Sequence, residues 1–221
     1  MKIKEMNFVI TGATGATATK LMDYFSALAQ FVTGTVRSLS GKHEKDENRA
    51  IIQMELLDHY SIDNSIAWIQ KEVGDIHVWL NVAGGFTMGK HVEEGRGDWS
   101  FMYNTNFMTA LNCCQQILPI MKKQGFGRII NFGSQAAVQG MPLAGPYCAS
   151  KAALHMLTKI TALELPNNLT CNAMLPGIID TKANRTAMPD ADHHNWVKPE
   201  QIAEKIEEVI LSELNGELIK I

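Results

Sequence analysis

Strand-like and helix-like segments alternate from one end of the chain to the other, and this alternation constrains the fold more than any other feature of the sequence. Short apolar or β-branched runs typical of buried strands lie at 7–11, 31–36, 51–57, 76–82, 128–132, 169–175 and 217–221. Segments with helical spacing lie between them at 21–29, 62–71, 98–123, 147–165 and 199–211. Strands that alternate with helices form right-handed βαβ units. The sequence therefore predicts an α/β protein with a doubly wound parallel sheet and helices on both faces.

Length and composition favour one domain. The chain has 221 residues, of which 46% are hydrophobic, which is enough for one sizeable core, so we expect a single domain over residues 1–221. Lys and Arg number 20 against 23 Asp and Glu, a net charge of −3, which argues against a nucleic-acid partner held by a basic surface. No apolar run reaches the roughly 18 residues that a membrane span needs, so we expect no membrane partner.

The cysteines and histidines carry no metal signature. The 4 cysteines lack the spacing of a metal site, and the N-terminal residues lack the pattern of a secretory signal. We therefore expect reduced thiols and a cytoplasmic protein. His193 and His194 stand near Asp190 and Asp192, but adjacent histidines point in different directions, so we expect no metal there.

A loop of small residues follows the first predicted strand. It reads Thr11-Gly12-Ala13-Thr14-Gly15-Ala16-Thr17-Ala18 and opens the next helix. Small residues allow a tight turn and a close approach of phosphate, and the helix N-terminus supplies free N–H groups. In this position the loop predicts a nucleotide site of the Rossmann type, in which Gly12, Thr14, Gly15 and Ala16 bind the nucleotide.

Tyr147 and Lys151 form a second constellation. They stand four residues apart at the start of a predicted helix, so both side chains lie on one face. An ammonium close to a phenol favours the phenolate, so we expect Lys151 to lower the pKa of Tyr147 toward neutrality. Tyr147 would then serve as a general acid or base. Ser134 follows the strand at 128–132, at the carboxyl edge of the sheet where ligands bind.

With these residues in view, the sequence resembles the short-chain dehydrogenase/reductase family over essentially its full length. The resemblance rests on Thr11-Gly12, Asn81-Val82-Ala83-Gly84, Asn106, Ser134, Tyr147, Lys151 and Pro176-Gly177. The separation of Ser134 and Tyr147, 13 residues, is the usual one in that family. The resemblance implies hydride transfer between a nicotinamide cofactor and a small-molecule carbonyl or alcohol, a reaction whose difficult chemistry belongs to the cofactor.

The same resemblance implies a catalytic tetrad. Tyr147 exchanges a proton with the substrate oxygen, and Ser134 hydrogen-bonds that oxygen. Lys151 holds the nicotinamide ribose and tunes Tyr147, while Asn106 positions a water that feeds the proton relay. Asn104 is a second candidate for the helix asparagine, and Asn106 fits the family pattern better.

Further cofactor contacts follow from the resemblance. We expect Asp58 at the adenine, Ala83 and Gly84 near its ribose, and the segment that contains Asn81 alongside. Pro176, Gly177, Ile179 and Thr181 should lie against the nicotinamide, with the Ile179 backbone and the Thr181 hydroxyl near the carboxamide.

Residues after the second strand favour NADP over NAD. An enzyme that prefers NAD usually has an acidic residue there for the ribose 2′-hydroxyl, but this chain has Arg37 and Ser38. Arg37 could pair with a 2′-phosphate and Ser38 could add a hydrogen bond, although Arg37 could also be an ordinary solvated charge. We therefore expect NADP, with NAD as the alternative.

Some features leave the substrate open. The loop spacing Gly12-x-x-Gly15-x-x-Ala18 differs from the Gly-x-x-x-Gly-x-Gly of many members. Residues 83–85, 184–192 and Trp196 resemble the dihydropteridine-reductase branch, which lacks a serine equivalent to Ser134. A quinonoid dihydropteridine reductase and a non-catalytic nucleotide sensor are therefore the alternatives to a carbonyl reductase. Residues 86–88 either contact substrate or pack as an ordinary loop.

The family resemblance also implies a homodimer or homotetramer. The helices predicted at 98–123 and 147–165 are those that pair between subunits in the family. Their apolar content permits such pairing, at Leu111, Ile117, Leu118, Ile120, Leu154 and Leu157.

Overall fold

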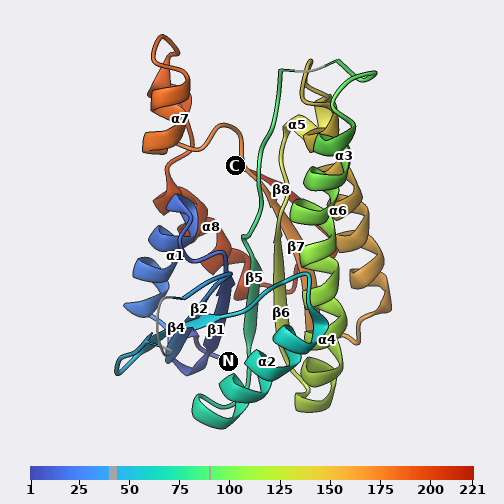
Figure 1. Ribbon diagram of the computed structural model, residues 1–221. Coiled ribbons are helices and arrows are strands. Elements are labelled where there is room, and N and C mark those ends of the chain that lie inside the picture. Colours follow the sequence, from blue (N-terminus) through green and yellow to red (C-terminus); the bar gives the residue numbers. More distant parts are fainter. Residues whose placement is uncertain (40–43, 90) are drawn as a thin grey trace.

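The computed structural model describes residues 1–39, 44–89 and 91–221. Within these residues the strands form one sheet in the order β3-β4-β2-β1-β5-β6-β7-β8 (Figure 1). The strands are β1 (Asn7–Thr11), β2 (Phe31–Val36), β3 (Glu44–Lys45), β4 (Arg49–Gln53), β5 (Val78–Asn81), β6 (Gly127–Phe132), β7 (Leu169–Leu175) and β8 (Leu218–Lys220). Every neighbouring pair except β3–β4 is parallel, which confirms the predicted doubly wound α/β fold.

Two details at the β4 edge differ from the sequence expectation. β3 pairs antiparallel with β4 because only a short turn joins them, closed by Asp46 N–H donating to Arg49 O at 2.8 Å. The strand predicted at 51–57 is instead β4 (Arg49–Gln53). It ends early because Asp58 N–H donates to Glu55 O at 3.1 Å, and this turn leads into the next helix.

Helices cover both faces of the sheet (Figure 1). They are α1 (Ala16–Ser26), α2 (His59–Glu72), α3 (Arg96–Tyr103), α4 (Thr109–Gln124), α5 (Ala136–Gln139), α6 (Gly145–Glu164), α7 (Lys182–Ala187) and α8 (Pro199–Ile210). In β1, Phe8 and Ile10 pack with α1 and α8, whereas Val9 packs with α2 and α4 on the other face. Successive strand residues point to opposite faces, so a strand covered on both sides is apolar at consecutive positions, as at Phe8, Val9 and Ile10.

The long helix predicted at 98–123 is continuous but not uniform. α3 passes into a π-helical turn, Asn104–Met108, and then into α4. Such wide turns occur as single insertions in α-helices and are frequent at functional sites. Here the turn contains Asn106, which is buried although Asn104 is exposed.

The four cysteines are free thiols, and Cys113, Cys114 and Cys171 are buried. They pack in the core on the α2 and α4 side of the sheet, and burial raises the pKa of the Cys113 and Cys114 thiols. These cysteines therefore behave as small apolar core residues. In the described part of the chain, no helix combines the length and apolar character needed to cross a bilayer.

Candidate active site

The four predicted catalytic side chains meet at the carboxyl edge of the sheet. Ser134 lies just after β6, and Tyr147 and Lys151 lie on the first turns of α6. α6 begins at Gly145 with Pro146 in its first turn, where the missing N–H costs nothing. The Lys151 side chain is buried, and its Nζ donates to Phe132 O at 2.6 Å. This hydrogen bond ties the helix with Tyr147 to the end of the strand that precedes Ser134.

Asn106 is held by both ends of its amide. Its Oδ1 accepts from Gly85 N–H at 2.9 Å, and its Nδ2 donates to Gly85 O at 3.0 Å. Nδ2 also lies 3.1 Å from Ser150 Oγ, next to Lys151. The π-helical turn thus fixes Asn106 between the β5 loop and α6. The structure brings Asn106, not Asn104, to the predicted cluster.

The phenol of Tyr147 differs electrostatically from the sequence expectation. Burial raises the pKa of Tyr147, while its hydrogen bond with Ser134 acts in the opposite direction and Cys148 adds to the rise. Lys151 does not lower this pKa, because its ammonium is directed to the Phe132 carbonyl. The prediction that Lys151 brings the pKa of Tyr147 toward neutrality is therefore wrong for this structure.

Burial also changes Lys151. Removal from water disfavours the charged ammonium and lowers the pKa of Lys151 to about 8. Lys151 remains mostly protonated at pH 7, but it can lose its proton under mildly alkaline conditions. Such a lysine can take part in proton movement at this site.

His155 is a site residue that the sequence reasoning missed. It lies one turn beyond Lys151 on the same face of α6, is buried, and its Nε2 accepts from Ser134 N–H at 3.2 Å. Burial, with Lys151 and Lys159, lowers the pKa of His155 to about 4, so the ring stays neutral and can accept this bond. The four-residue step from Lys151 is visible in the sequence, but the contact with Ser134 depends on the packing of α6 against β6.

A glycine permits the close contact at His155. A Cβ on Gly133 would lie 2.3 Å from His155 Nε2. Only a residue without a side chain fits there, so Gly133 allows the imidazole to reach the Ser134 backbone.

The small-residue loop has the geometry of a phosphate-binding turn. Gly12 has φ of 72°, and a Cβ there would lie 2.9 Å from Ala83 Cα. α1 begins at Ala16 directly after Gly15, so its first N–H groups face the loop. A glycine turn that leads into a helix N-terminus suits a diphosphate. The structure thus provides a place for the predicted nucleotide at Gly12, Thr14, Gly15 and Ala16.

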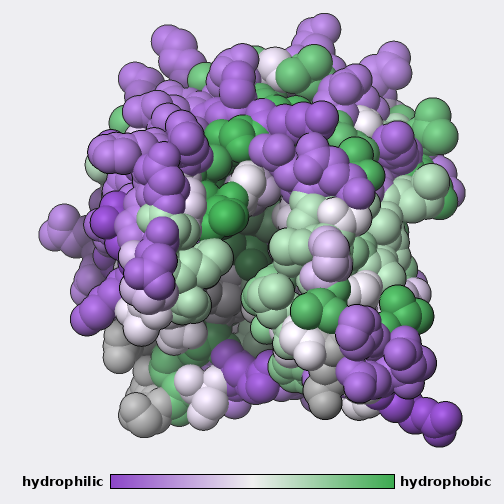
Figure 2. Space-filling model, turned by 90° about the horizontal axis from the view of Figure 1, so that it is seen from above, coloured by the Kyte–Doolittle hydropathy of each residue, from purple (hydrophilic) through white to green (hydrophobic). Residues whose placement is uncertain are grey.

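Gly84 joins this loop to the predicted catalytic residues. A Cβ on Gly84 would lie 2.8 Å from Asn106 Oδ1 and 3.4 Å from Lys151 Nζ. The backbone at 83–84 therefore runs from the glycine turn directly to the buried lysine. Figure 2 shows this face of the molecule from above, with a hollow near its centre. The arrangement suits an extended ligand with phosphate groups at one end and a reactive group near Lys151 at the other.

Other predicted cofactor residues have defined structural partners. Asp58 caps α2 by accepting from Tyr60 N–H at 3.0 Å. Asn81 is buried, and its amide bonds Trp79 and Asn131, each at 2.8 Å. The amide of Asn81 thus links β5 to β6, which leaves only its backbone to approach a cofactor.

The segment after β7 places the remaining predicted residues in a row. Pro176 is buried, and Gly177 is exposed. Ile179 forms a bridge with Val197, and the Thr181 hydroxyl caps α7 by accepting from Asn184 N–H at 3.2 Å. On the opposite side of the site, Arg37 and Ser38 follow β2 and are exposed.

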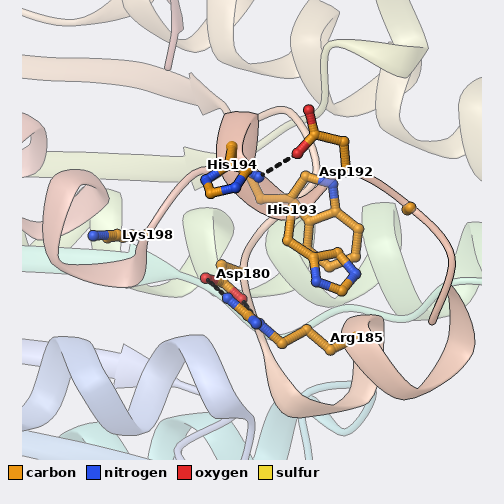
Figure 3. Close-up of a pocket in the computed structure, with 8 residues that line it drawn as sticks. Asp180, Arg185, Asp192, His193, His194 and Lys198 are labelled. Carbon is orange, nitrogen blue, oxygen red and sulfur yellow. Dashed lines mark hydrogen bonds and ion pairs between the residues drawn. The ribbon is translucent and has the colours of Figure 1, made fainter.

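A polar cavity of about 480 Å³ lies beside α7 (Figure 3). Its Arg185 guanidinium forms two bonds with Asp180, at 2.5 and 2.8 Å, and the His193 ring packs on Trp196. Asp192 accepts from His194 N–H at 3.0 Å. Among the described residues, no group of three or more His, Cys, Asp or Glu side chains is arranged to hold a metal ion.

Comparison with known proteins decides the family. The sequence profile of the short chain dehydrogenase family matches residues 7–192, which include the glycine loop and every predicted catalytic residue. The chain is a short chain dehydrogenase. It is therefore an oxidoreductase of the NAD(P)-dependent dehydrogenase and reductase class, and its glycine turn and Lys151 fit a nicotinamide dinucleotide.

This short chain dehydrogenase is similar to other oxidoreductases in sequence and to a solved structure in fold. It is 27% identical to the uncharacterized oxidoreductase YvrD of Bacillus subtilis over 188 residues, which are 80% of this chain and 70% of YvrD. It is 32% identical to the 3-oxoacyl-(acyl-carrier-protein) reductase FabG of Thermotoga maritima over 162 residues, 69% of this chain and 66% of that protein. The solved structure of ElxO with NADP bound has a TM-score of 0.88 and 24% identity, covering 100% of this chain and 97% of ElxO. That likeness shows the shared fold.

Proposed function

We propose that this short chain dehydrogenase reduces the carbonyl group of a small molecule with NADPH, and that Tyr147 donates the proton to the carbonyl oxygen. The convergence of Ser134, Tyr147, Lys151 and Asn106 at one edge of the sheet carries this proposal. Two relatives support the direction by their names, FabG of Thermotoga maritima and a 3-ketodihydrosphingosine reductase of Bacteroides thetaiotaomicron.

Each side chain has a distinct task. A nicotinamide cofactor held there would supply hydride to the carbonyl carbon. Tyr147 gives its proton to the oxygen, and the Ser134 hydroxyl hydrogen-bonds the same oxygen and orients it. The buried Lys151 would hold the ribose hydroxyls, and with its lowered pKa of about 8 it can return a proton to the Tyr147 phenolate that remains. Asn106 keeps the Gly85 segment and Ser150 in place beside Lys151.

The residues after β2 support a preference for NADPH. The Arg37 side chain is 76% exposed, and its ion pair with Glu55 is long, at 3.6 Å. An exposed, weakly paired guanidinium is available for a 2′-phosphate, and Ser38 can add a hydrogen bond. We propose that these two residues select NADP over NAD.

We further propose a homodimer or homotetramer in the cytoplasm. Three apolar side chains, Met156, Ile160 and Leu163, are exposed along α6 and provide a surface for a second copy. Ile117 and Leu154, by contrast, are buried in the protomer. Unpaired thiols favour a reducing compartment.

The proposal is tested with Tyr147→Phe. This change removes only the transferable proton, so the Kd for NADPH should stay within about twofold while kcat for ketone reduction falls about a thousandfold or more. Tyr60→Phe is the matched control, because Tyr60 is highly exposed on α2. Ketone reduction by Tyr147→Phe at the rate of the unaltered protein would refute the proposed role. NADPH binding by the unaltered protein without turnover of any carbonyl would favour a nucleotide sensor.

A further inference from the structure

The mouth of the site is lined by exposed apolar side chains. Phe86, Met88 and Leu143, here called the apolar rim, are 53%, 56% and 39% exposed. The Phe86 ring meets the Tyr147 ring edge to face, with centroids 4.9 Å apart. A group that covers Phe86 therefore lies close to the Tyr147 ring. This contact separates the apolar rim from an ordinary exposed loop.

The two loops of the apolar rim are tied together. Gly89 N–H donates to Leu143 O at 2.9 Å, which links the loop after β5 to the loop before α6. A Cβ on Gly145 would lie 3.4 Å from the Trp99 ring, so the start of α6 also packs closely against α3. The apolar rim is thus one surface assembled from two chain segments.

Leu143 has an unusual backbone. Its φ is 61°, and it is the one non-glycine residue with positive φ in the described part of the chain. A leucine in this left-handed conformation is strained, and glycine would adopt it freely. Strain of this kind collects at functional sites. A side chain kept at a position where it costs stability indicates that the side chain is used.

Charge points in the same direction. Segments 84–89 and 133–150 contain no charged residue. The Arg185 guanidinium in the neighbouring cavity is already paired with Asp180 through two bonds. Within these two described segments an anionic substrate would find no cationic partner, whereas an apolar group would cover surface that is otherwise left to water.

We infer that the substrate is an apolar carbonyl compound, whose hydrocarbon part lies on Phe86, Met88 and Leu143 while its carbonyl oxygen faces Tyr147 and Ser134. This inference rests on the proposed reductase function and adds the substrate class. The reaction balances as in any ketone reduction: hydride to carbon, a proton to oxygen, and an alcohol as product.

The experiment compares methyl ketones that differ only in the tail. We expect kcat/KM with NADPH for 4-phenylbutan-2-one to exceed that for 4-oxopentanoate about thirtyfold or more, because the phenyl group is buried and the carboxylate finds no partner. Phe86→Ser should lower kcat/KM for the phenyl ketone about tenfold and that for acetone less than about threefold. The control is Leu211→Ser, which removes a side chain that is 51% exposed at the end of α8.

Leu143→Gly provides an independent variant. Glycine relieves the strained φ, so Tm should stay the same or rise, while kcat/KM for the phenyl ketone falls about fivefold. A loss of selectivity together with unchanged or higher Tm cannot come from unfolding. Preference for 4-oxopentanoate, or equal effects of Phe86→Ser on all ketones, would overturn the inference. A change in sedimentation mass without a change in selectivity, in Phe86→Ser or Leu143→Gly, would also overturn the inference. The apolar rim would then contact a second copy of the chain.

Binding separates this inference from the reductase proposal. Calorimetry with 4-phenylbutan-2-ol and NADP⁺ should show binding that Phe86→Ser weakens about tenfold and Leu211→Ser leaves unchanged. If this pattern holds but no ketone is reduced, the apolar site stands and the reductase proposal fails. If ketones are reduced but the alcohol binds equally to both variants, the reductase stands and the inference fails.

Discussion

Two regions of the proposed active site differ in how firmly their side chains are fixed: the apolar rim and the catalytic cluster, which here means the four predicted catalytic residues together with His155. In the cluster, Asn106, Lys151 and His155 are buried and hydrogen-bonded to backbone atoms of Gly85, Phe132 and Ser134. The apolar rim consists of exposed side chains on two loops. The difference indicates that the fold itself fixes the chemistry, whereas substrate choice depends on loops that can change without disturbing the core. Substitutions in the cluster should affect all substrates, and substitutions in the rim should change selectivity.

Lys151→Met should have the largest effect. We expect kcat to fall about a thousandfold for every carbonyl, because the variant loses the buried amine that can return a proton to Tyr147 and hold the cofactor ribose. The lowered pKa of Lys151, about 8 against 10.5, also makes stability depend on pH. Between these values the unfolded chain binds more protons, so the free energy of unfolding of the unaltered protein should rise by about 3 kcal/mol from pH 8 to 10.5.

The variant should lack that rise. Urea unfolding at several pH values measures it, with Lys159→Met as the control on the exposed side of α6. A parallel pH dependence in Lys151→Met and the unaltered protein would show that Lys151 is not the titrating group.

Ser134→Ala should lower kcat/KM for ketones about a hundredfold, because the hydroxyl that orients the carbonyl oxygen is lost. Reduction of quinonoid dihydropterin separates the two branches of the family. The chain would be assigned to the dihydropteridine-reductase branch if the unaltered protein reduced no ketone and Ser134→Ala kept pterin turnover within about threefold. Ser100→Ala on the exposed side of α3 is the control.

Arg37→Ser should affect the cofactor rather than the carbonyl. The Kd for NADPH should rise about tenfold while that for NADH stays within about twofold, since only the 2′-phosphate pairs with the guanidinium. Fluorescence titration measures both constants. Arg49→Ser is matched, because Arg49 is also paired with a carboxylate, Asp23, at 3.5 Å. A preference of the unaltered protein for NADH would refute the assignment to NADP.

His155→Gln should have the smallest effect on rate, within about threefold at pH 7.5, since the glutamine oxygen can accept from Ser134 N–H. Its effect should appear in acid. The lowered pKa of His155 means that the unfolded chain binds a proton more readily, so stability is present above pH 6.5 and is lost as the pH falls toward 4. The glutamine variant should lose less stability over that range than the unaltered protein, with His194→Gln as the control. Equal acid sensitivity would contradict the buried, neutral imidazole.

Much of the framework could be predicted from the sequence because it depends on local patterns. Strands covered on both faces are mostly apolar, as in β7, where every residue is buried, and their order along the chain implies the parallel sheet. Tyr147 and Lys151 are four residues apart, which places both side chains on the same face of a helix. The first helix was predicted to begin at 21 rather than at Ala16, because the small residues of its first turn carry no apolar periodicity.

The finer parts of the site depend on contacts between segments far apart in the sequence. The hydrogen bond of Lys151 joins it to Phe132, 19 residues away, and that of His155 joins it to Ser134, 21 residues away. Neither bond can be predicted from composition or spacing. The direction of the Tyr147 pKa shift depends on burial, which a sequence motif does not specify. The positive φ of Leu143 could not be predicted either, because leucine rarely adopts this conformation and no sequence motif indicates it.

The π-helical turn at Asn104–Met108 has a consequence for how this protein can change. An α-helix rotates by about 100° per residue, so one residue absorbed into a wider turn shifts the phase of everything beyond it. Before the turn Met102 faces inward, and after it Cys113, Ile117 and Met121 do so. Deleting one residue from the turn would restore a regular helix and rotate those three side chains away from the sheet. The position of Asn106 and the packing of α4 therefore depend on the same wide turn. This segment should tolerate a substitution far better than an insertion or a deletion.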